Sequence, residues 1–248
     1  MKLPWLQPGE AFPPATAAWG PNQPAPGLLA AGGSLDVDTL VRAYQGGIFP
    51  WFSAEQPILW WSTAPRMVLP VGEFALHRSL RKTLRRWLTD STGEVRFDSA
   101  FPEVIRACAT SPREGQGGTW IVPEMVNAYI NLHLAGYAHS VETWVDGQLV
   151  GGLYCVALGR AVFGESMFAR RTDASKLALC ALVAYCRSQG VELIDCQQDT
   201  RHLASLGARA IPREDFLKHV ARTSLLPALD WHFKPVYWNS LVPMAADA

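Results

Sequence analysis

Two carboxylates stand in stretches of the chain that otherwise have the pattern of buried strands. Glu165 lies in AVFGESMF and Asp195 in VELIDCQ, and apolar residues surround both. A carboxylate in such a position costs free energy unless it is paired or serves a chemical purpose. These two acids are therefore the first candidates for a functional site.

The alternation of side chains along a strand extends this candidate site. Alternate residues of a strand share a face, so we expect Gln197 to point the same way as Asp195. By the same rule, Phe163 and Met167 should share the face of Glu165. If the two strands pair, one surface carries three polar groups beside two apolar side chains, which is typical of a small-ligand site.

Other interpretations of these residues stay open or are weaker. Each acid could instead end its strand at the solvent edge, or pair with an arginine such as Arg170 or Arg201. The segment GESMF resembles a nucleophile elbow only superficially, because Phe168 stands where that motif needs glycine. Cys196 is beside an acid, which raises the pKa of a thiol and makes it a poor nucleophile.

The elements that must position these residues predict an α+β protein. From Tyr137 the hydrophobic period is two, and an Asp146-Gly147 turn joins two of three expected antiparallel strands, which end at AVFGESMFA. A helix, ASKLALCALVAYCRSQ, follows with Thr172 or Asp173 as its cap. It leads to VELIDCQ, which should run parallel to the strand before the helix. This β-β-β-α-β order is the core arrangement of N-acyltransferase folds.

The chain divides into two expected domains, a small N-terminal one over residues 1–65 and a larger one over 66–248 with a mixed sheet. In the first, Ser34 or Asp36 can cap a helix over roughly 36–46, and this part should not close a core alone. In the second, further helices are expected over 74–88, 98–109 and 123–135.

Composition bounds the class of protein. Lys and Arg together number 22, as do Asp and Glu, so a nucleic-acid partner would have to show as local patterning. The five cysteines contain no C-x-x-C pair, and with the histidines they show no metal-binding spacing, so we expect free thiols and no metal or cofactor. The N-terminus lacks the apolar core of a signal peptide, and no run approaches 18 apolar residues, which predicts a cytoplasmic protein without a membrane span.

Local charge patterning appears in the helix expected over 74–88. At about 100° per residue, its leucines gather on one side. The opposite side carries five basic residues: Arg78, Arg81, Lys82, Arg85 and Arg86. This could be an ordinary solvated face, or it could bind phosphates, because no acid stands among the nine residues that carry the five cations. Trp51 and Trp120 stand in turn-rich loops, where they could cap the core or stack on a nucleobase.

The nature of the donor follows from a missing glycine. An acyl-CoA transferase needs a glycine-bearing pyrophosphate loop before the helix, and this loop is ARRTDASK. A basic helix with unpaired tryptophans suggests instead an RNA donor that ends in adenosine. An acyl-CoA N-acyltransferase and a non-catalytic tRNA-binding module remain the alternatives.

Long motifs between Gly27 and Val220 resemble one family. They are GLLAAGGSLDVDTLVRAYQGGIFPWF, PILWWSTAPRMVL, GTWI, HSVETW, LVGGLY, FGESMF, LIDCQ and HLASLGA. They look like the bacterial leucyl/phenylalanyl-tRNA–protein transferases. The resemblance implies an acetyltransferase-like larger domain. It also implies transfer of Leu or Phe, and weakly Met, from aminoacyl-tRNA to proteins that begin with Arg or Lys, which marks them for degradation by the N-end rule. Neither ATP nor a metal would be required, and a monomer is expected.

The resemblance also implies roles for residues at matching motif positions. Asp195 and Gln197 of LIDCQ would be the catalytic pair, joined by Glu165 of FGESMF at the acceptor. Trp51 of FPWF and Trp120 of GTWI match positions near the donor adenosine and the acceptor. The basic helix matches the family's tRNA-binding patch.

The pocket for the transferred amino acid would be lined by Leu153, Val162, Phe163 and Met167. The family has Met at the position of Leu153 and Phe at that of Val162. Both replacements are apolar and change the volume of the pocket.

Overall fold

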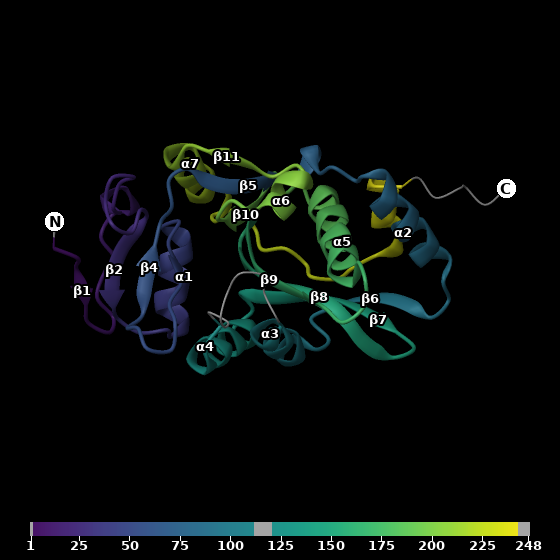
Figure 1. The fold of residues 1–248 in the computed structure, drawn as a ribbon, viewed down its shortest axis with the longest axis horizontal. Helices are drawn as coiled ribbons and strands as arrows, with labels where there is room; N and C mark the ends of the chain where they lie inside the picture. The colour runs from purple at the N-terminus through teal and green to yellow at the C-terminus, as the bar shows by residue number, and fades with distance from the viewer. Residues whose placement is uncertain (1, 112–120, 243–248) are drawn as a thin grey trace.

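The computed structural model describes residues 2–111 and 121–242. In this part of the chain, seven strands form a large mixed sheet in the order β11-β5-β10-β9-β8-β7-β6 (Figure 1). The strands are β5 (Arg66–Pro70), β6 (Gly93–Phe97), β7 (Ala138–Val145), β8 (Gln148–Leu158), β9 (Ala161–Ala169), β10 (Leu193–Gln197) and β11 (Arg209–Ile211).

A second, four-stranded sheet is built from the N-terminal part of the described chain, in the order β1-β2-β4-β3. Its strands are β1 (Trp5–Leu6), β2 (Leu28–Gly32), β3 (Phe49–Pro50) and β4 (Leu59–Trp61). One apolar cluster joins side chains of both sheets, including Trp60 of β4 and Phe163 of β9. The N-terminal part therefore buries its apolar side chains together with the rest of the molecule. The division into two domains at residue 65 stays a prediction.

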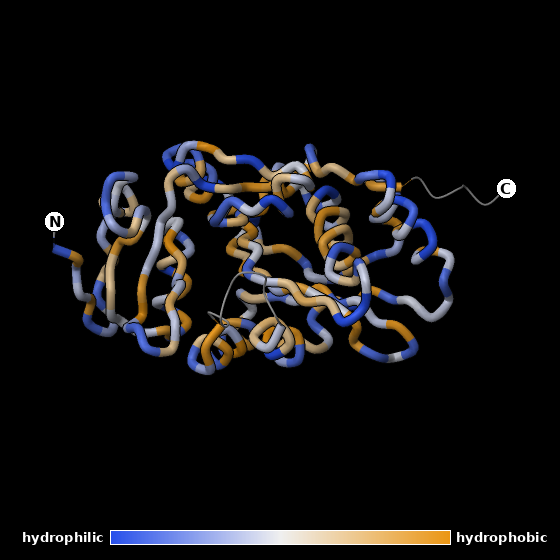
Figure 2. Tube along the Cα trace, viewed as in Figure 1, coloured by the Kyte–Doolittle hydropathy of each residue, from blue (hydrophilic) through white to orange (hydrophobic). Residues whose placement is uncertain are grey.

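Helices cover both faces of the large sheet (Figure 1). The helices are α1 (Val37–Gln45), α2 (Arg78–Thr89), α3 (Phe101–Thr110), α4 (Pro123–Leu134), α5 (Ala174–Ser188), α6 (Arg201–Ser205) and α7 (Arg213–Thr223), with 3-10 turns at Ala15–Ala17, Val71–Glu73 and Pro235–Ser240. One core cluster draws on α1, α3, α4 and α7, and the other on α2 and α5. Figure 2 shows that apolar residues run along the inner strands and α5, whereas hydrophilic ones gather on α2 and the turns.

The predicted β-β-β-α-β arrangement is confirmed by the order of β7, β8, β9, α5 and β10. Strands β7, β8 and β9 pair antiparallel, and β10 pairs parallel to β9, with Asp195 beside Phe163. Helix α5 lies directly on β8, because Gly151 has no side chain: a Cβ there would come within 2.5 Å of the Cβ of Ala174. The predicted mixed α+β fold with an acetyltransferase-like larger part is therefore present.

For the individual helices and strands, the predicted type of structure was right more often than the predicted first and last residues. Asp36 caps α1 by accepting a hydrogen bond from the amide of Thr39, as one of the two predicted caps. Helix α2 begins at Arg78, four residues later than predicted, because a 3-10 turn precedes it. Helix α3 begins at Phe101, three residues later than predicted, and β6, an edge strand that was not predicted, ends at Phe97. Asp173 stands at the start of α5 but makes no capping hydrogen bond with its side chain.

Candidate functional site

A cavity of about 240 Å³ opens between β9, β10, α5 and α6. Its apolar walls come from Leu69, Leu153, Met167, Leu179, Leu182 and Ile194. Polar side chains line the same space, among them Glu165 of β9 and Gln197 of β10. The cavity thus combines an apolar wall with a polar group from each of two neighbouring strands, as the sequence predicts for a small-ligand site.

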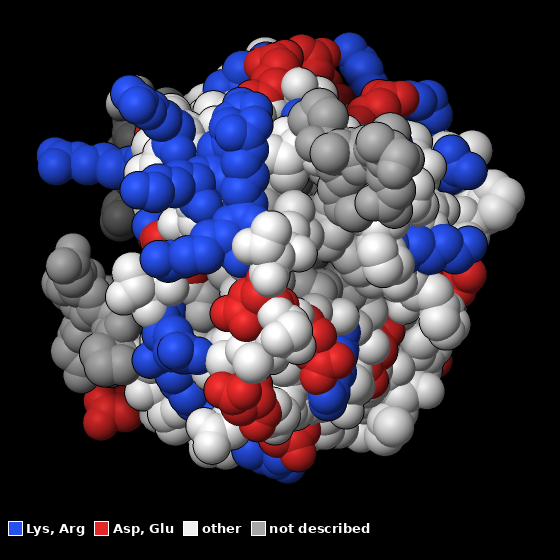
Figure 3. Space-filling view, turned by 90° about the vertical axis from the view of Figure 1, so that its right-hand side faces the viewer, with Lys and Arg blue, Asp and Glu red and all other residues white. Residues whose placement is uncertain are grey.

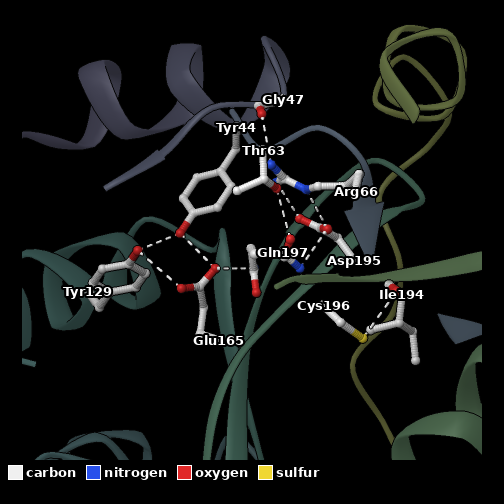
Figure 4. Close-up of polar contacts among 10 residues, drawn as sticks. All are labelled: Tyr44, Gly47, Thr63, Arg66, Tyr129, Glu165, Ile194, Asp195, Cys196 and Gln197. Carbon is white, nitrogen blue, oxygen red and sulfur yellow. Dashed lines mark hydrogen bonds and ion pairs between the residues drawn. The ribbon is translucent and has the colours of Figure 1, made fainter. Parts of the chain in front are cut away.

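Glu165 lies at the centre of a polar network that connects β9 to two helices (Figure 4). Its Oε1 accepts a hydrogen bond from the hydroxyl of Tyr44 on α1 at 2.8 Å and from Nε2 of Gln197 at 3.3 Å. The hydroxyl of Tyr129 on α4 lies 3.5 Å from Oε2 and is hydrogen-bonded to that of Tyr44. Burial raises the pKa of the Glu165 carboxyl to about 8, although the hydrogen bond from Tyr44 opposes this rise. The carboxyl is therefore largely protonated near neutral pH when the cavity is empty.

Asp195 does not line the cavity, because its carboxylate forms a buried ion pair with Arg66 of β5 (Figure 4). Nε of Arg66 donates to Oδ1 at 2.7 Å, and Nη2 donates to Oδ2 at 2.6 Å. Asp195 is 2% exposed and Arg66 is 0% exposed. Of the two alternatives for the acid, pairing with an arginine is the correct one, but the partner is neither Arg170 nor Arg201.

Gln197 connects this ion pair to the cavity. Its backbone amide donates a hydrogen bond to Oδ1 of Asp195 at 3.0 Å, and its backbone carbonyl accepts one from the hydroxyl of Thr63 at 2.8 Å. Its side chain reaches Glu165. Gln197 thus touches both acids, one through its backbone and the other through its side chain (Figure 4).

The prediction that Asp195 and Gln197 share one face of their strand is wrong. The pairing of β10 with β5 shifts register between these two residues, and Gln197 has a left-handed backbone with φ 55°. This irregularity turns the Gln197 side chain into the cavity, while Asp195 faces Arg66. Strand alternation assumes a regular pleat, and a bulge breaks it.

A second bulge contradicts the expected alternation in β9. There, Tyr154 pairs with Ser166 and Cys155 with Gly164, so Glu165 is the extra residue. As a result, Phe163 packs in the core cluster on the α1 and α7 side, whereas Met167 packs against the cluster on the α5 side. The two side chains do not share a face.

Two of the four residues predicted to line the amino-acid pocket line this cavity, and binding of the amino acid there stays a prediction. Leu153 and Met167 line the cavity with Glu165. Val162 and Phe163 do not, and Phe163 instead packs beside Tyr44, with the ring centroids 5.0 Å apart. The bulge in β9 is the physical reason for the misplacement of Phe163.

The two tryptophans expected near the donor have different outcomes. Trp51 is partly exposed and packs edge-on against Trp61, with the ring centroids 5.3 Å apart. Its carbonyl accepts a hydrogen bond from the indole of Trp61 at 2.7 Å. It does not line the cavity, and its contact with a donor stays a prediction. Trp120 lies outside the described residues.

The predicted basic helix surface is present on α2. Its five cations, Arg78, Arg81, Lys82, Arg85 and Arg86, are all exposed, and Leu80 and Leu84 on the other side are buried. None of the five forms an ion pair with a described residue. Figure 3, which faces the end of the molecule where α2 lies, shows Lys and Arg side chains gathered on one side.

Residues 2–111 and 121–242 contain no group of three or more His, Cys, Asp or Glu side chains placed to hold a metal ion. Over the same ranges, no helix has the length and apolar character needed to cross a membrane.

Burial, with a smaller contribution from Asp195, raises the pKa of the Cys196 thiol well above its ordinary value. A thiol with a raised pKa is a poor nucleophile, as the sequence predicts for Cys196.

Four residues of the site were missed from the sequence: Arg66, Tyr44, Tyr129 and Thr63. Arg66 carried the same signal as the acids, because it begins the apolar strand RMVLP. The tyrosines gave no comparable signal, since a tyrosine on the apolar side of a helix is an ordinary core residue. Only the packing of α1 and α4 brings their hydroxyls to Glu165.

Comparison with known proteins identifies the family. Residues 68–221 match the family "Leucyl/phenylalanyl-tRNA protein transferase", and residues 33–64 match the N-terminal domain of the same family. A leucyl/phenylalanyl-tRNA–protein transferase of Polaromonas sp. is 63% identical over 97% of this chain and 94% of its own. One of Albidiferax ferrireducens is 59% identical over the same shares of the two chains.

A solved structure also resembles the chain, but weakly. FemX has a TM-score of 0.44 and 11% identity, and the match covers 71% of this chain and 66% of that one. Likeness at this level supports no statement about activity. The family match over residues 33–64 and 68–221, and the relatives that span 97% of the chain, in contrast confirm the resemblance seen in the motifs. The chain therefore belongs to the leucyl/phenylalanyl-tRNA–protein transferase family, which makes it an aminoacyltransferase.

Proposed function

We propose that this protein transfers Leu or Phe, and weakly Met, from aminoacyl-tRNA to proteins whose first residue is Arg or Lys. Membership of the family supports the reaction type. The observation that carries the proposal is the cavity beside Gln197, which is apolar along its walls and polar where β9 and β10 meet. Its volume of about 240 Å³ is sufficient for an apolar side chain that is not branched at Cβ, such as that of Leu or Phe.

The donor's aminoacyl side chain would lie against Leu153, Met167 and Leu182, with its ester carbonyl toward Gln197. Apolar contact of this kind separates near-isosteric side chains by only about 1–3 kcal/mol, which would allow a weak reaction with Met. Leu153 and the space around it set the volume available to Phe. The balance between Leu and Phe therefore depends on this side chain.

The chemistry needs a neutral amine rather than an activated acid, because the ester of aminoacyl-tRNA is already reactive. An N-terminal amine has a pKa of about 8 and is mostly protonated at neutral pH. We infer that the side chain of Gln197 orients this amine and the reacting carbonyl, and that Asp195 acts through Gln197 rather than by direct contact. Much of the acceleration would come from positioning two bound substrates.

Glu165 would meet the cationic first residue of the acceptor, Arg or Lys. Its carboxyl is largely neutral in the empty cavity, because burial raises its pKa to about 8. A nearby ammonium favours the ionised form of a carboxyl. We therefore infer that Glu165 loses its proton when the acceptor binds, and that it then pairs with the incoming cation.

The exposed cations of α2 would bind phosphates of the tRNA, at a distance from the aminoacyl end. Their lack of ion pairs with described residues leaves them available to an external anion. Binding through such contacts depends strongly on salt concentration. A cytoplasmic location and a monomeric state accompany this proposal, because the donor is made in the cytoplasm and one chain supplies every group named here.

One assay tests the proposal. The protein is incubated with Leu-tRNA carrying labelled leucine and with a peptide that begins with Arg, and labelled peptide is measured with and without RNase. Transfer that RNase abolishes is the expected result. Transfer from a labelled acyl-CoA would indicate the acyl-CoA N-acyltransferase instead. Tight binding of tRNA without any labelled peptide would indicate the non-catalytic module.

A further inference from the structure

The guanidinium of Arg66 touches both Asp195 and the N-terminal part of the chain. Two of its nitrogens hold the two oxygens of Asp195. The third, Nη1, lies 3.3 Å from the carbonyl oxygen of Gly47, four residues before Trp51. The guanidinium thus uses its planar fork on one side and its remaining nitrogen on the other, which a point charge cannot do.

The packing around Arg66 holds this geometry rigidly. The guanidinium carbon lies 4.7 Å from the ring centroid of Phe49 and 4.4 Å from that of Phe216. The side chain is 0% exposed. Aromatic rings and a bidentate carboxylate leave the guanidinium little freedom to move.

Stability alone is a weak explanation for such a pair. The cost of removing two charges from water can exceed their attraction, and replacing a buried pair by apolar residues is often neutral or stabilising. Here Arg66 connects two segments, one at Asp195 and one at Gly47, and the proposed reaction requires a fixed position of each relative to the other. Asp195 accepts a hydrogen bond from the backbone amide of Gln197, which has a left-handed conformation, and Gly47 lies in the turn that leads from α1 through β3 to Trp51.

We propose that Arg66 is a positioning residue for the reaction. It fixes the carboxylate of Asp195, which in turn fixes Gln197, and it aligns this pair with the loop at Gly47. This inference rests on the proposed transfer, which supplies the role of Gln197, but its geometric part can be tested without the reaction. Arg66 itself touches no substrate.

The test compares Arg66→Lys and Arg66→Gln with the wild-type protein. Lysine keeps the charge but cannot hold both carboxylate oxygens and the Gly47 carbonyl, so kcat for transfer from Leu-tRNA should fall about 100-fold, as for a displaced reacting group. The Kd for uncharged tRNA should stay within about twofold, since α2 is not altered. Hydrogen exchange should accelerate in peptides covering residues 46–52 and 194–198, and not elsewhere in the large sheet.

Arg187→Lys is the matched control. Arg187 donates hydrogen bonds to the carbonyls of Val71 and Ser240, at 3.0 and 2.6 Å, and reaches no residue of the site. It should lose comparable backbone contacts without loss of kcat. Arg66→Gln covers the possibility that one Arg66 variant fails to fold.

Three outcomes decide the inference. A fall in kcat with local exchange at the two segments supports it. A kcat for Arg66→Lys within about threefold of wild type overturns it, and so does accelerated exchange throughout the sheet, which would show a general structural role. If the wild-type protein transfers nothing, the proposed function fails, and exchange at the two segments alone still decides whether Arg66 holds them together.

Discussion

Two carboxylates with similar sequence surroundings have opposite electrostatic environments. Asp195 forms an ion pair with Arg66 and accepts a hydrogen bond from the backbone amide of Gln197, so its charge is compensated by contacts within the protein. Glu165 is surrounded by neutral hydrogen-bond donors: the hydroxyls of Tyr44 and Tyr129 and the side-chain amide of Gln197. The difference between an arginine and a tyrosine as neighbour decides which acid forms a buried ion pair and which lies among neutral donors.

The raised pKa of Glu165 predicts a pH dependence of stability. The pKa is about 8 in the folded protein against an ordinary 4.5, so the folded state binds this proton more tightly than the unfolded chain does. This contribution to stability is complete below the unfolded pKa and is lost as pH rises toward the folded one. Between about pH 5 and pH 8, wild type should lose a few kcal/mol relative to Glu165→Gln, since each pKa unit corresponds to about 1.4 kcal/mol.

Urea unfolding at several pH values measures this difference for Glu165. The exposed Glu55→Gln serves as control and should follow wild type throughout. Parallel pH profiles for wild type and Glu165→Gln would rule out the raised pKa.

At the scale of elements, α2 and α5 show how one helix serves the surface and another the core. Helix α2 presents its cations outward and buries only Leu80 and Leu84. Helix α5 buries most of its residues against the sheet. The first can change its surface without loss of fold, whereas the second tolerates almost no added volume.

The basic face of α2 predicts salt-dependent binding. Arg81/Arg85→Glu should weaken tRNA binding and reduce the slope of log K against log salt by about 2, one unit for each lost phosphate contact. Fluorescence anisotropy with labelled tRNA at increasing salt measures the slope. Lys218/Arg222→Glu makes the same charge change with the same spacing on α7, and it should leave the slope unaltered. Equal slopes for wild type and the α2 variant would mean that α2 does not bind phosphates.

The contact between α5 and β8 predicts a strong effect of one methyl group. Gly151→Ala would bring a Cβ within 2.5 Å of the Cβ of Ala174 and 2.9 Å of its backbone carbon, so α5 must move. Overpacking of this kind costs about 1–3 kcal/mol of unfolding free energy. Gly72→Ala is the control, because its Cβ would have no neighbour within 4 Å. Thermal unfolding of the two variants compares them, and equal midpoints would contradict the close approach.

At the scale of the whole molecule, the site is assembled from both sheets. The N-terminal part supplies the hydroxyl of Tyr44 to Glu165, the carbonyl of Gly47 to Arg66, and the hydroxyl of Thr63 to the carbonyl of Gln197. The larger part supplies the cavity and both acids. The N-terminal part is therefore structurally part of the site, as well as a cover for apolar surface.

Because Tyr44 of α1 donates a hydrogen bond to Glu165 of β9, a substitution of Tyr44 should change the pKa of Glu165. Because the hydrogen bond from Tyr44 lowers the pKa of Glu165, Tyr44→Phe should raise that pKa above its value of about 8. The pH at which transfer depends on Glu165 should move upward, and the rate should fall about 10-fold. Tyr237→Phe, a partly buried tyrosine on the C-terminal 3-10 turn, is the control. Identical pH–rate profiles for Tyr44→Phe and wild type would contradict the connection.

The sequence by itself determined the β-β-β-α-β core, the basic helix surface and the family. These features depend on periodicity, turn residues and long motifs, all of which are local in the chain. Hydrophobic alternation also identified Glu165 and Asp195 as acids out of place. The family resemblance named Leu153 and Met167, and both line the cavity beside Glu165.

The tertiary structure decided where those acids point and what holds them. Two bulges reverse the strand alternation at Glu165 and before Gln197, and a bulge arises from pairing with a neighbouring strand rather than from its own sequence. The partners of the acids, Tyr44 and Arg66, are each more than 100 residues away in the chain. Contacts at such separation form only when the sheets and helices pack, because no local preference encodes them.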